Sequence, residues 1–172
     1  MFFKRLKKKS NQKYINNILN NRKSSVDARP IKSVGVIFNH DEFKNYDEVR
    51  DIFKSIGINE NRVKFIAFID DGKSRPNGWD AFFYPENFSW KGKVEGVDLV
   101  DFVNEPFDAL ISYYQNDNLE LNMVTTLSKA NFKIGISNKD ERLYDFIINI
   151  DPNQINIFKN ELIKYLKVFS KI

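Results

Sequence analysis

The sequence predicts an α/β fold: a Rossmann-like three-layer sandwich with a mostly parallel sheet of five or six strands, preceded by a basic helix. Short apolar segments of strand length alternate along the chain with amphipathic segments of helix length, as in βαβ units. The 172 residues, 42% of them hydrophobic, are enough for one domain with a buried core. We therefore divide the chain into a basic helix with its linker (1–30) and a single α/β domain (31–172).

The first helix is predicted over residues 2–23, and the segment KSSVDARP ends it because Pro30 and two serines break helical structure. The alternation begins after this linker. It predicts a strand at 31–38, a helix at 46–57 that ends at Gly57, and a strand at 62–69.

The second half of the chain continues the alternation after a turn-rich loop at 70–80. The segment FDALISYY is apolar enough for a central strand, and the last segment repeats apolar residues at helical spacing. The predicted strands are 81–84, 107–114, 132–137 and 144–150, and the predicted helices are 97–103, 118–130 and 153–172.

Charge is distributed unevenly along the chain. Residues 1–32 contain ten lysines and arginines and one acid, a net charge of +9, whereas residues 33–172 carry −5. A strongly basic segment on a mildly acidic body suggests an anionic partner, such as a nucleic acid, a membrane surface or an acidic protein.

Several classes of function lack their sequence signals. The chain has no cysteine and a single histidine, so we expect neither disulfides nor a multi-histidine metal site. Neither a secretory h-region nor an apolar stretch of membrane-spanning length occurs, so we expect a cytoplasmic protein. No GxGxxG or GxxxxGK[ST] motif is present, and we expect no dinucleotide, no P-loop nucleotide and no other cofactor.

Ligands of doubly wound sheets bind at the carboxyl ends of the strands, where the strand order reverses. If strands 31–38 and 107–114 flank that switch point, His40, Asp117 and Asn138 lie near a pocket there. His40 could act as a general base. We favour a simpler interpretation, in which these residues are solvated loop residues and Asn39 or Asp41 caps the next helix.

Residues 70–93 mix basic and aromatic side chains, a combination that can clamp and stack single-stranded nucleic acid. We favour the alternative that most of these aromatic residues belong to the core. The candidate residues of this second contact loop are Lys73, Arg75, Trp79, Trp90 and Lys91.

The N-terminal helix carries two separate apolar patches, because Phe2, Phe3 and Leu6 lie well over 100° around the helix from the group at 14–19. We expect the group at 14–19 to pack on the sheet domain and the first patch to project beyond it. The residues offered to a partner are then Phe2, Phe3, Lys4, Arg5, Lys7, Lys8, Lys9 and Lys13.

The segments LSKANFKIGI, FDALISYY and YDFIINI, within the order of elements above, resemble a family of small Bacteroidota proteins that is classed as a domain of unknown function. The resemblance implies an α/β fold and a bacterial cytoplasmic setting, without site residues. Residues 107–150 alone look like the acceptor-side domain of heptosyltransferase-type glycosyltransferases. Because 172 residues leave no room for the sugar-nucleotide domain of those enzymes, we expect a shared half-fold used for binding rather than inherited transferase activity.

The function expected from these observations is non-enzymatic binding, through the basic helix, to RNA or to a ribonucleoprotein such as the ribosome. One alternative is a peripheral protein whose Phe2, Phe3 and Leu6 enter an anionic membrane surface. Another is a small glycosyltransferase-like enzyme or sugar-ligand binder with its site at the strand ends. A protein partner also remains open.

Overall fold

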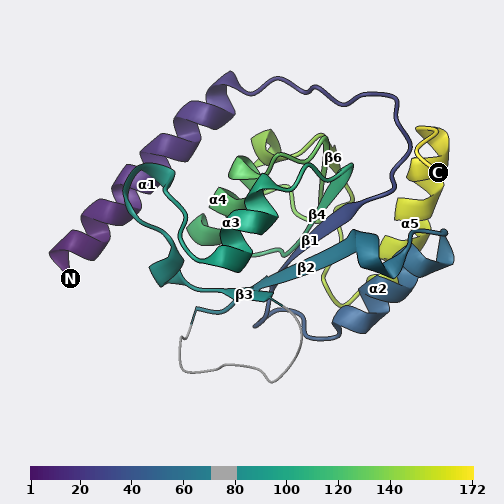
Figure 1. Cartoon of the computed structure of the whole chain (residues 1–172), viewed down its shortest axis with the longest axis horizontal. Helices are drawn as coiled ribbons and strands as arrows, with labels where there is room; N and C mark the ends of the chain where they lie inside the picture. The colour runs from purple at the N-terminus through teal and green to yellow at the C-terminus, as the bar shows by residue number, and fades with distance from the viewer. Residues whose placement is uncertain (71–80) are drawn as a thin grey trace.

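The computed structural model describes residues 1–70 and 81–172 and contains the predicted parallel sheet (Figure 1). Its six strands have the order β3-β2-β1-β4-β5-β6, and every neighbouring pair is parallel. The switch in strand order therefore lies between β1 and β4, the two strands for which the candidate pocket was considered. The strands are β1 (Val34–Asn39), β2 (Val63–Phe68), β3 (Ala81–Phe83), β4 (Ala109–Tyr113), β5 (Phe132–Gly135) and β6 (Phe146–Ile147).

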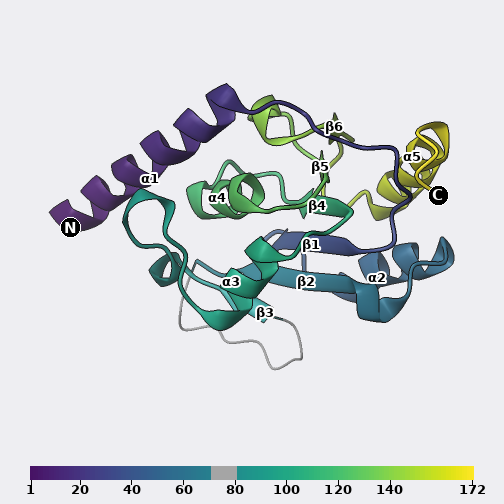
Figure 2. The same ribbon diagram turned by 45° about the horizontal axis from the view of Figure 1, so that its top comes forward.

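Helices cover both faces of this sheet and complete the three-layer sandwich (Figure 2). Side chains alternate along β1, so Val36 and Phe38 join the core under α2 and α5, whereas Ile37 joins the core under α3 and α4. The helices are α1 (Phe2–Asn21), α2 (Tyr46–Ser55), α3 (Val97–Asn104), α4 (Leu119–Leu127) and α5 (Ile155–Val168).

Helix α2 is terminated by Gly57 as predicted, but it does not begin at a predicted cap residue. Gly57 adopts φ +82°, and the amides of Gly57 and Ile58 donate to the carbonyls of Lys54 and Phe53, which is a Schellman motif. The residue before α2 is Asn45. The expectation that Asn39 or Asp41 caps this helix is therefore wrong, since the Asn39 side chain instead accepts from the Asp41 amide.

The linker between α1 and β1 is held along its length by polar contacts. Asn131 bonds to Ser25 and Asp27, and Lys171 Nζ donates to the carbonyls of Asp27 and Arg29. The Asp108 carboxylate accepts from the amides at positions 32 and 33. These contacts explain why β1 begins at Val34 rather than at the predicted residue 31.

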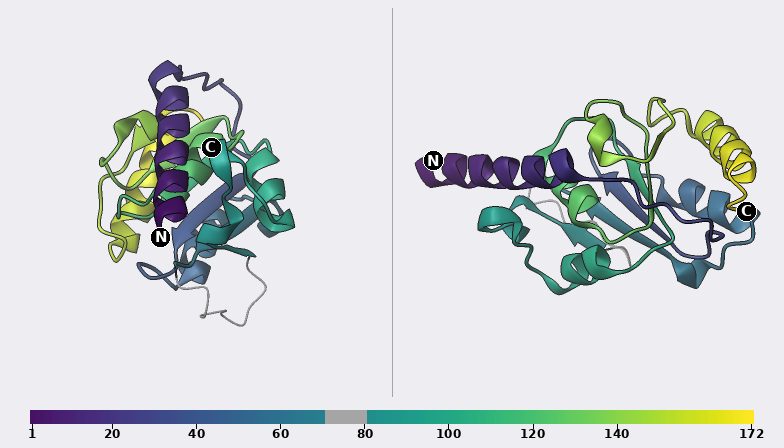
Figure 3. Two further views of the ribbon diagram at one scale, coloured as in Figure 1. Left: turned by 90° about the vertical axis from the view of Figure 1, so that its left-hand side faces the viewer. Right: turned by 90° about the horizontal axis from the view of Figure 1, so that it is seen from above.

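Helix α1 is anchored along its second half and projects at its start (Figure 3). Ile15 and Leu19 are 1% and 4% exposed, whereas Phe2 and Phe3 are 70% and 75% exposed. The helix contacts α4, the turn η3 (Trp90–Gly92) and the turn η4 (Glu141–Leu143). These segments follow the carboxyl ends of β4, β3 and β5, so α1 lies on the side of the sheet where doubly wound folds bind ligands.

Replacing Gly35 with alanine tests the packing of the central strand. A Cβ at this position would lie 2.7 Å from the Phe107 ring and 3.0 Å from Phe102. Because close-packed cores resist added volume, we expect Gly35→Ala to lower the free energy of unfolding by about 1–3 kcal/mol. Urea unfolding measures the change. Ser24→Ala in the exposed linker is the control and should change stability by less than about 0.5 kcal/mol; equal effects of the two variants would contradict this packing.

Candidate functional site

The carboxylate of Glu42 occupies the switch point between β1 and β4. Its Oε2 accepts from the Gln115 amide at 2.6 Å, and its Oε1 accepts from the Asn116 amide at 3.0 Å. The Asn39 side chain donates to the same Oε1 at 2.9 Å. Glu42 thus joins the loops that follow the two central strands.

These donors resemble those that hold anions at the strand ends of nucleotide-binding sheets, where backbone amides face a phosphate. Here a side chain of the chain itself takes the acceptor position. Its neighbours Asn39, His40 and Asp41 were candidates on sequence grounds, but Glu42 was not. Its partners follow β4, more than 70 residues later, so no local pattern could reveal the contact.

The predicted pocket residues do not converge on one point. His40 Nδ1 lies 2.7 Å from the Tyr46 hydroxyl, and the imidazole packs edge-on against Phe82. Asp117 accepts from the Asn122 side chain at 2.7 Å, and Asn138 is exposed. Within the described residues these three side chains share no hydrogen bond. Burial lowers the pKa of His40, and the charge of Lys44 lowers it further, so the neutral imidazole is favoured.

A buried polar network lies beneath the strand ends, between β4 and α4. Tyr114 contacts Asn122 and Thr125 through its hydroxyl, and Thr125 contacts Ser112 at 2.8 Å. Burial raises the pKa of Tyr144, whose hydroxyl faces this network, to about 12. These hydroxyls therefore stay protonated and serve as donors that hold α4 on the sheet.

Lys133 on β5 is a buried cation, with 6% of its surface exposed. Its Nζ donates to the carbonyls of Thr125 at 2.7 Å and Thr126 at 3.2 Å, in the last turn of α4. The pKa of Lys133 is lowered to about 8, mainly by burial. The charge of Arg22 acts in the same direction, and that of Asp145 opposes the shift. This lysine closes the C-terminal end of the helix, where the carbonyls lack helical partners.

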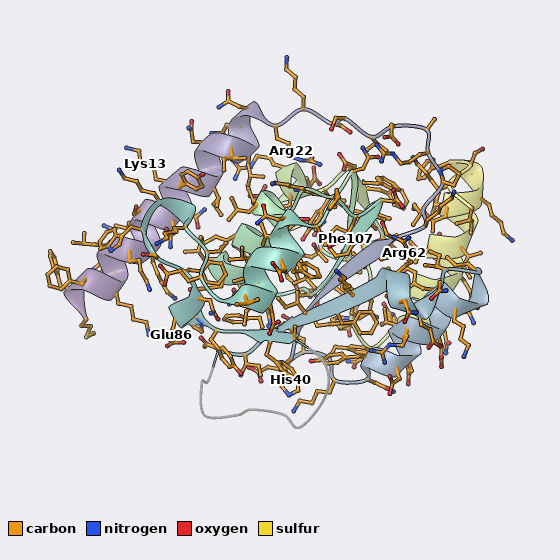
Figure 4. The ribbon with its side chains drawn as sticks, viewed as in Figure 1. Lys13, Arg22, His40, Arg62, Glu86 and Phe107 are labelled. Atoms are coloured by element: carbon orange, nitrogen blue, oxygen red, sulfur yellow. The ribbon has the colours of Figure 1, made fainter. Side chains whose placement is uncertain are left out.

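The predicted basic helix lies next to Trp90 and Lys91, the two candidates of the second contact loop that the structure describes. The hairpin of residues 88–94 turns at η3, and its tip packs against α1. One surface hollow is lined by Phe3, Lys4, Lys7, Pro85, Glu86 and Trp90, and a neighbouring groove includes Lys9, Lys13, Tyr14 and Lys91. We call the residues of both sets the basic–aromatic surface. In Figure 4, Lys13 and Glu86 mark its two sides, and His40 lies apart from it.

A hydrogen bond and a close aromatic contact hold the two parts of this surface together. The Gly92 amide donates to the buried Asn11 side chain at 3.0 Å. The Tyr14 ring lies so close to Gly92 that a Cβ there would come within 2.3 Å of it. Gly92 and Lys91 both have positive φ, 73° and 55°, which turns the hairpin sharply enough to meet the helix. Asn11 was not predicted as a contact residue.

Most of the predicted contact cations remain available to a partner. Within residues 1–70 and 81–172, Lys8 alone among the basic residues at positions 4–13 approaches a carboxylate, 3.9 Å from Glu120. Arg22 and Arg29, which contribute to the +9 charge, instead form ion pairs with Asp145 and Asp27. Among residues 1–32, the cations that lack a carboxylate partner in the described part of the chain are therefore mostly those in the first 13 residues.

The aromatic residues of 81–93 divide between core and surface. Phe83 and Phe88 are buried, as the preferred interpretation expected, but Trp90 is 46% exposed. Lys73, Arg75 and Trp79, the other candidates in this loop, lie outside the described residues.

The described residues contain neither a candidate metal site nor a candidate membrane-spanning helix. They contain no group of three or more histidine, aspartate or glutamate residues placed to hold a metal ion. None of their helices combines the length and apolarity needed to cross a membrane.

A family model described as a family of unknown function (DUF6913) matches residues 7–169. The chain belongs to this family. The match confirms the resemblance to a domain of unknown function and says nothing about Bacteroidota or about the glycosyltransferase resemblance of residues 107–150. No curated protein and no solved structure matched the chain.

Replacing Glu42 with glutamine tests its part in joining the strand ends. The variant loses the negative charge that strengthens hydrogen bonds from two amides, so we expect a loss of about 1–3 kcal/mol in the free energy of unfolding. Asp41→Asn, in the same loop but with an exposed side chain, is the matched control and should be nearly neutral. Chemical denaturation measures both, and indistinguishable variants would refute this role.

The pKa of Lys133 predicts how stability changes at alkaline pH. The folded-state value of about 8 lies below the ordinary value of 10.5. Between these values the unfolded chain binds more protons than the folded one, so raising the pH favours the fold, by up to about 3 kcal/mol. Lys133→Met removes this titration. We expect the stability of the unmodified chain to rise relative to the variant from pH 8 to 10.5, and parallel curves would contradict the prediction.

Proposed function

We propose that this protein binds RNA, alone or within a ribonucleoprotein such as the ribosome, through the basic–aromatic surface. The observation that carries the proposal is the cluster of cations on the projecting end of α1, which lacks carboxylate partners apart from Lys8 within the described part of the chain. Exposed cations of one sign attract phosphates and release counterions on binding.

A rigid connection to the body supports the same function. A free basic tail would lose conformational entropy when it binds, whereas α1 is already fixed by Asn11, Ile15 and Leu19. The body then acts as a scaffold that presents the helix. We prefer binding to catalysis because the acceptor position at the switch point is taken by Glu42.

Charge neutralisation at matched positions tests this proposal. In one variant Lys4, Lys7 and Lys9 become glutamine; in the control Lys159, Lys164 and Lys167 on α5 become glutamine, which gives the same net charge. Fluorescence anisotropy with a labelled single-stranded RNA follows binding between about 50 and 200 mM salt. We expect tight binding at low salt, and a salt slope reduced by about 2 in the α1 variant only, because each phosphate contact contributes about 0.7.

Two outcomes would overturn the proposal: no RNA binding at low salt, or equal losses in both variants. A further experiment distinguishes RNA binding from membrane binding by sedimenting the protein with phosphatidylglycerol vesicles. It includes a variant in which Phe2, Phe3 and Leu6 become serine. Binding to vesicles but not to RNA, lost in that variant, would identify a membrane-surface protein instead. Point variants are preferable to removal of residues 1–30, because that removal would also strip Ile15 and Leu19 from the core.

A further inference from the structure

One hollow on the basic–aromatic surface combines aromatic side chains, on which a base can stack, with lysines, which can bind a phosphate. Trp90, Phe3 and Pro85 supply apolar surface, and Lys4 and Lys7 stand beside them. Trp90 and Phe3 are well exposed, at 46% and 75%, although aromatic side chains of this size are usually buried. Two exposed aromatic residues from distant parts of the chain thus share one site with two cations.

Hydrogen bonds hold the backbone around Trp90 in place, which restricts where the indole can lie. The amide of Ser89 donates to the Lys93 carbonyl at 2.8 Å, and the Lys93 amide donates to the Trp90 carbonyl at 3.3 Å. The contact of Gly92 with Asn11 then fastens the hairpin tip to α1. A stacking surface held in this way costs little entropy when a base settles on it.

We propose that this hollow binds one unpaired base of the RNA, stacked on Trp90, with the adjoining phosphates against Lys4 and Lys7. The inference rests on the proposed function and adds its substrate class: single-stranded rather than duplex RNA. A base inside a duplex is already stacked on its neighbours, so its face is not open to the indole. Sequence-tolerant stacking of this kind is typical of proteins that bind single strands.

Glu86 fits the same arrangement. Its exposed side chain lines the hollow and forms no ion pair with a described residue. The negative charge of this carboxylate would repel a phosphate. A carboxylate accepts hydrogen bonds from the N–H groups on the edge of a base. Glu86 therefore orients the base toward the hollow and the phosphates toward the lysines.

The test uses the fluorescence of Trp90 in the full chain. The chain has two tryptophans, so Trp79→Phe leaves Trp90 as the reporter. The ligands are a single-stranded RNA of about 16 nucleotides, an oligomer of the same length in which all bases are absent, and the duplex form. We expect the single strand to quench the emission, and the abasic oligomer and the duplex to leave it nearly unchanged.

Two substitutions at position 90 separate stacking from charge. Trp90→Ala should weaken binding to the single strand by about fivefold to a hundredfold, and Trp90→Phe, which keeps an aromatic face, by much less. The salt slope should stay the same in both, because the phosphate contacts remain. Unchanged melting temperatures confirm that the variants are folded.

The results distinguish failure of this inference from failure of the proposed function. If RNA binds and the α1 charge variant weakens it, but Trp90→Ala binds as tightly as the unmodified chain, the stacking site is wrong and the proposed function stands. Equal quenching by the abasic oligomer or the duplex also overturns the stacking site. If no RNA binds at low salt, both proposals fail together.

Discussion

One buried hydrogen bond joins the N-terminal helix to the hairpin of residues 88–94: the Gly92 amide donates to the Asn11 side chain. The site is buried, so losing the acceptor would leave a donor unpaired, a defect that costs about 1–3 kcal/mol. The residue must also be glycine, since the Tyr14 ring occupies the space of a Cβ. Together with the burial of Ile15 and Leu19, this contact sets the direction of α1, so that residues 2–9 project and Trp90 shares a hollow with Phe3.

The sheet has the strand order of dinucleotide-binding proteins but uses its switch point differently. In those proteins a ligand phosphate joins the loops after the central strands. Here Glu42 joins them with hydrogen bonds to Gln115 and Asn116. The fold is thus complete without a ligand at this position, and the same architecture serves as a support for surface features at its edge.

The sequence was sufficient to predict the fold because each element has its own periodicity. The α2 segment and the division of α1 into two patches follow from local spacing. Contacts between distant residues have no such signal: Asn11 and Gly92 are 81 positions apart. Strand β6 is two residues long instead of seven, although the amides of Ile148 and Ile150 beyond its end still donate to the carbonyls of Gly135 and Ile136. The basic helix and the second contact loop were therefore predicted as separate features. In the structure, packing brings α1 and the hairpin of residues 88–94 together.

The contacts of α1 also determine the order in which the protein can assemble. This helix is synthesised before the segments on which it packs, which are Gly92, α4 and finally the segment around Asp145, 123 positions after Arg22. An isolated helix of 20 residues is only marginally stable in water, and contacts across such sequence distances form slowly. The basic segment thus stays undocked during most of synthesis. The lysines and arginines of α1 are therefore exposed to solvent until the sheet is nearly complete.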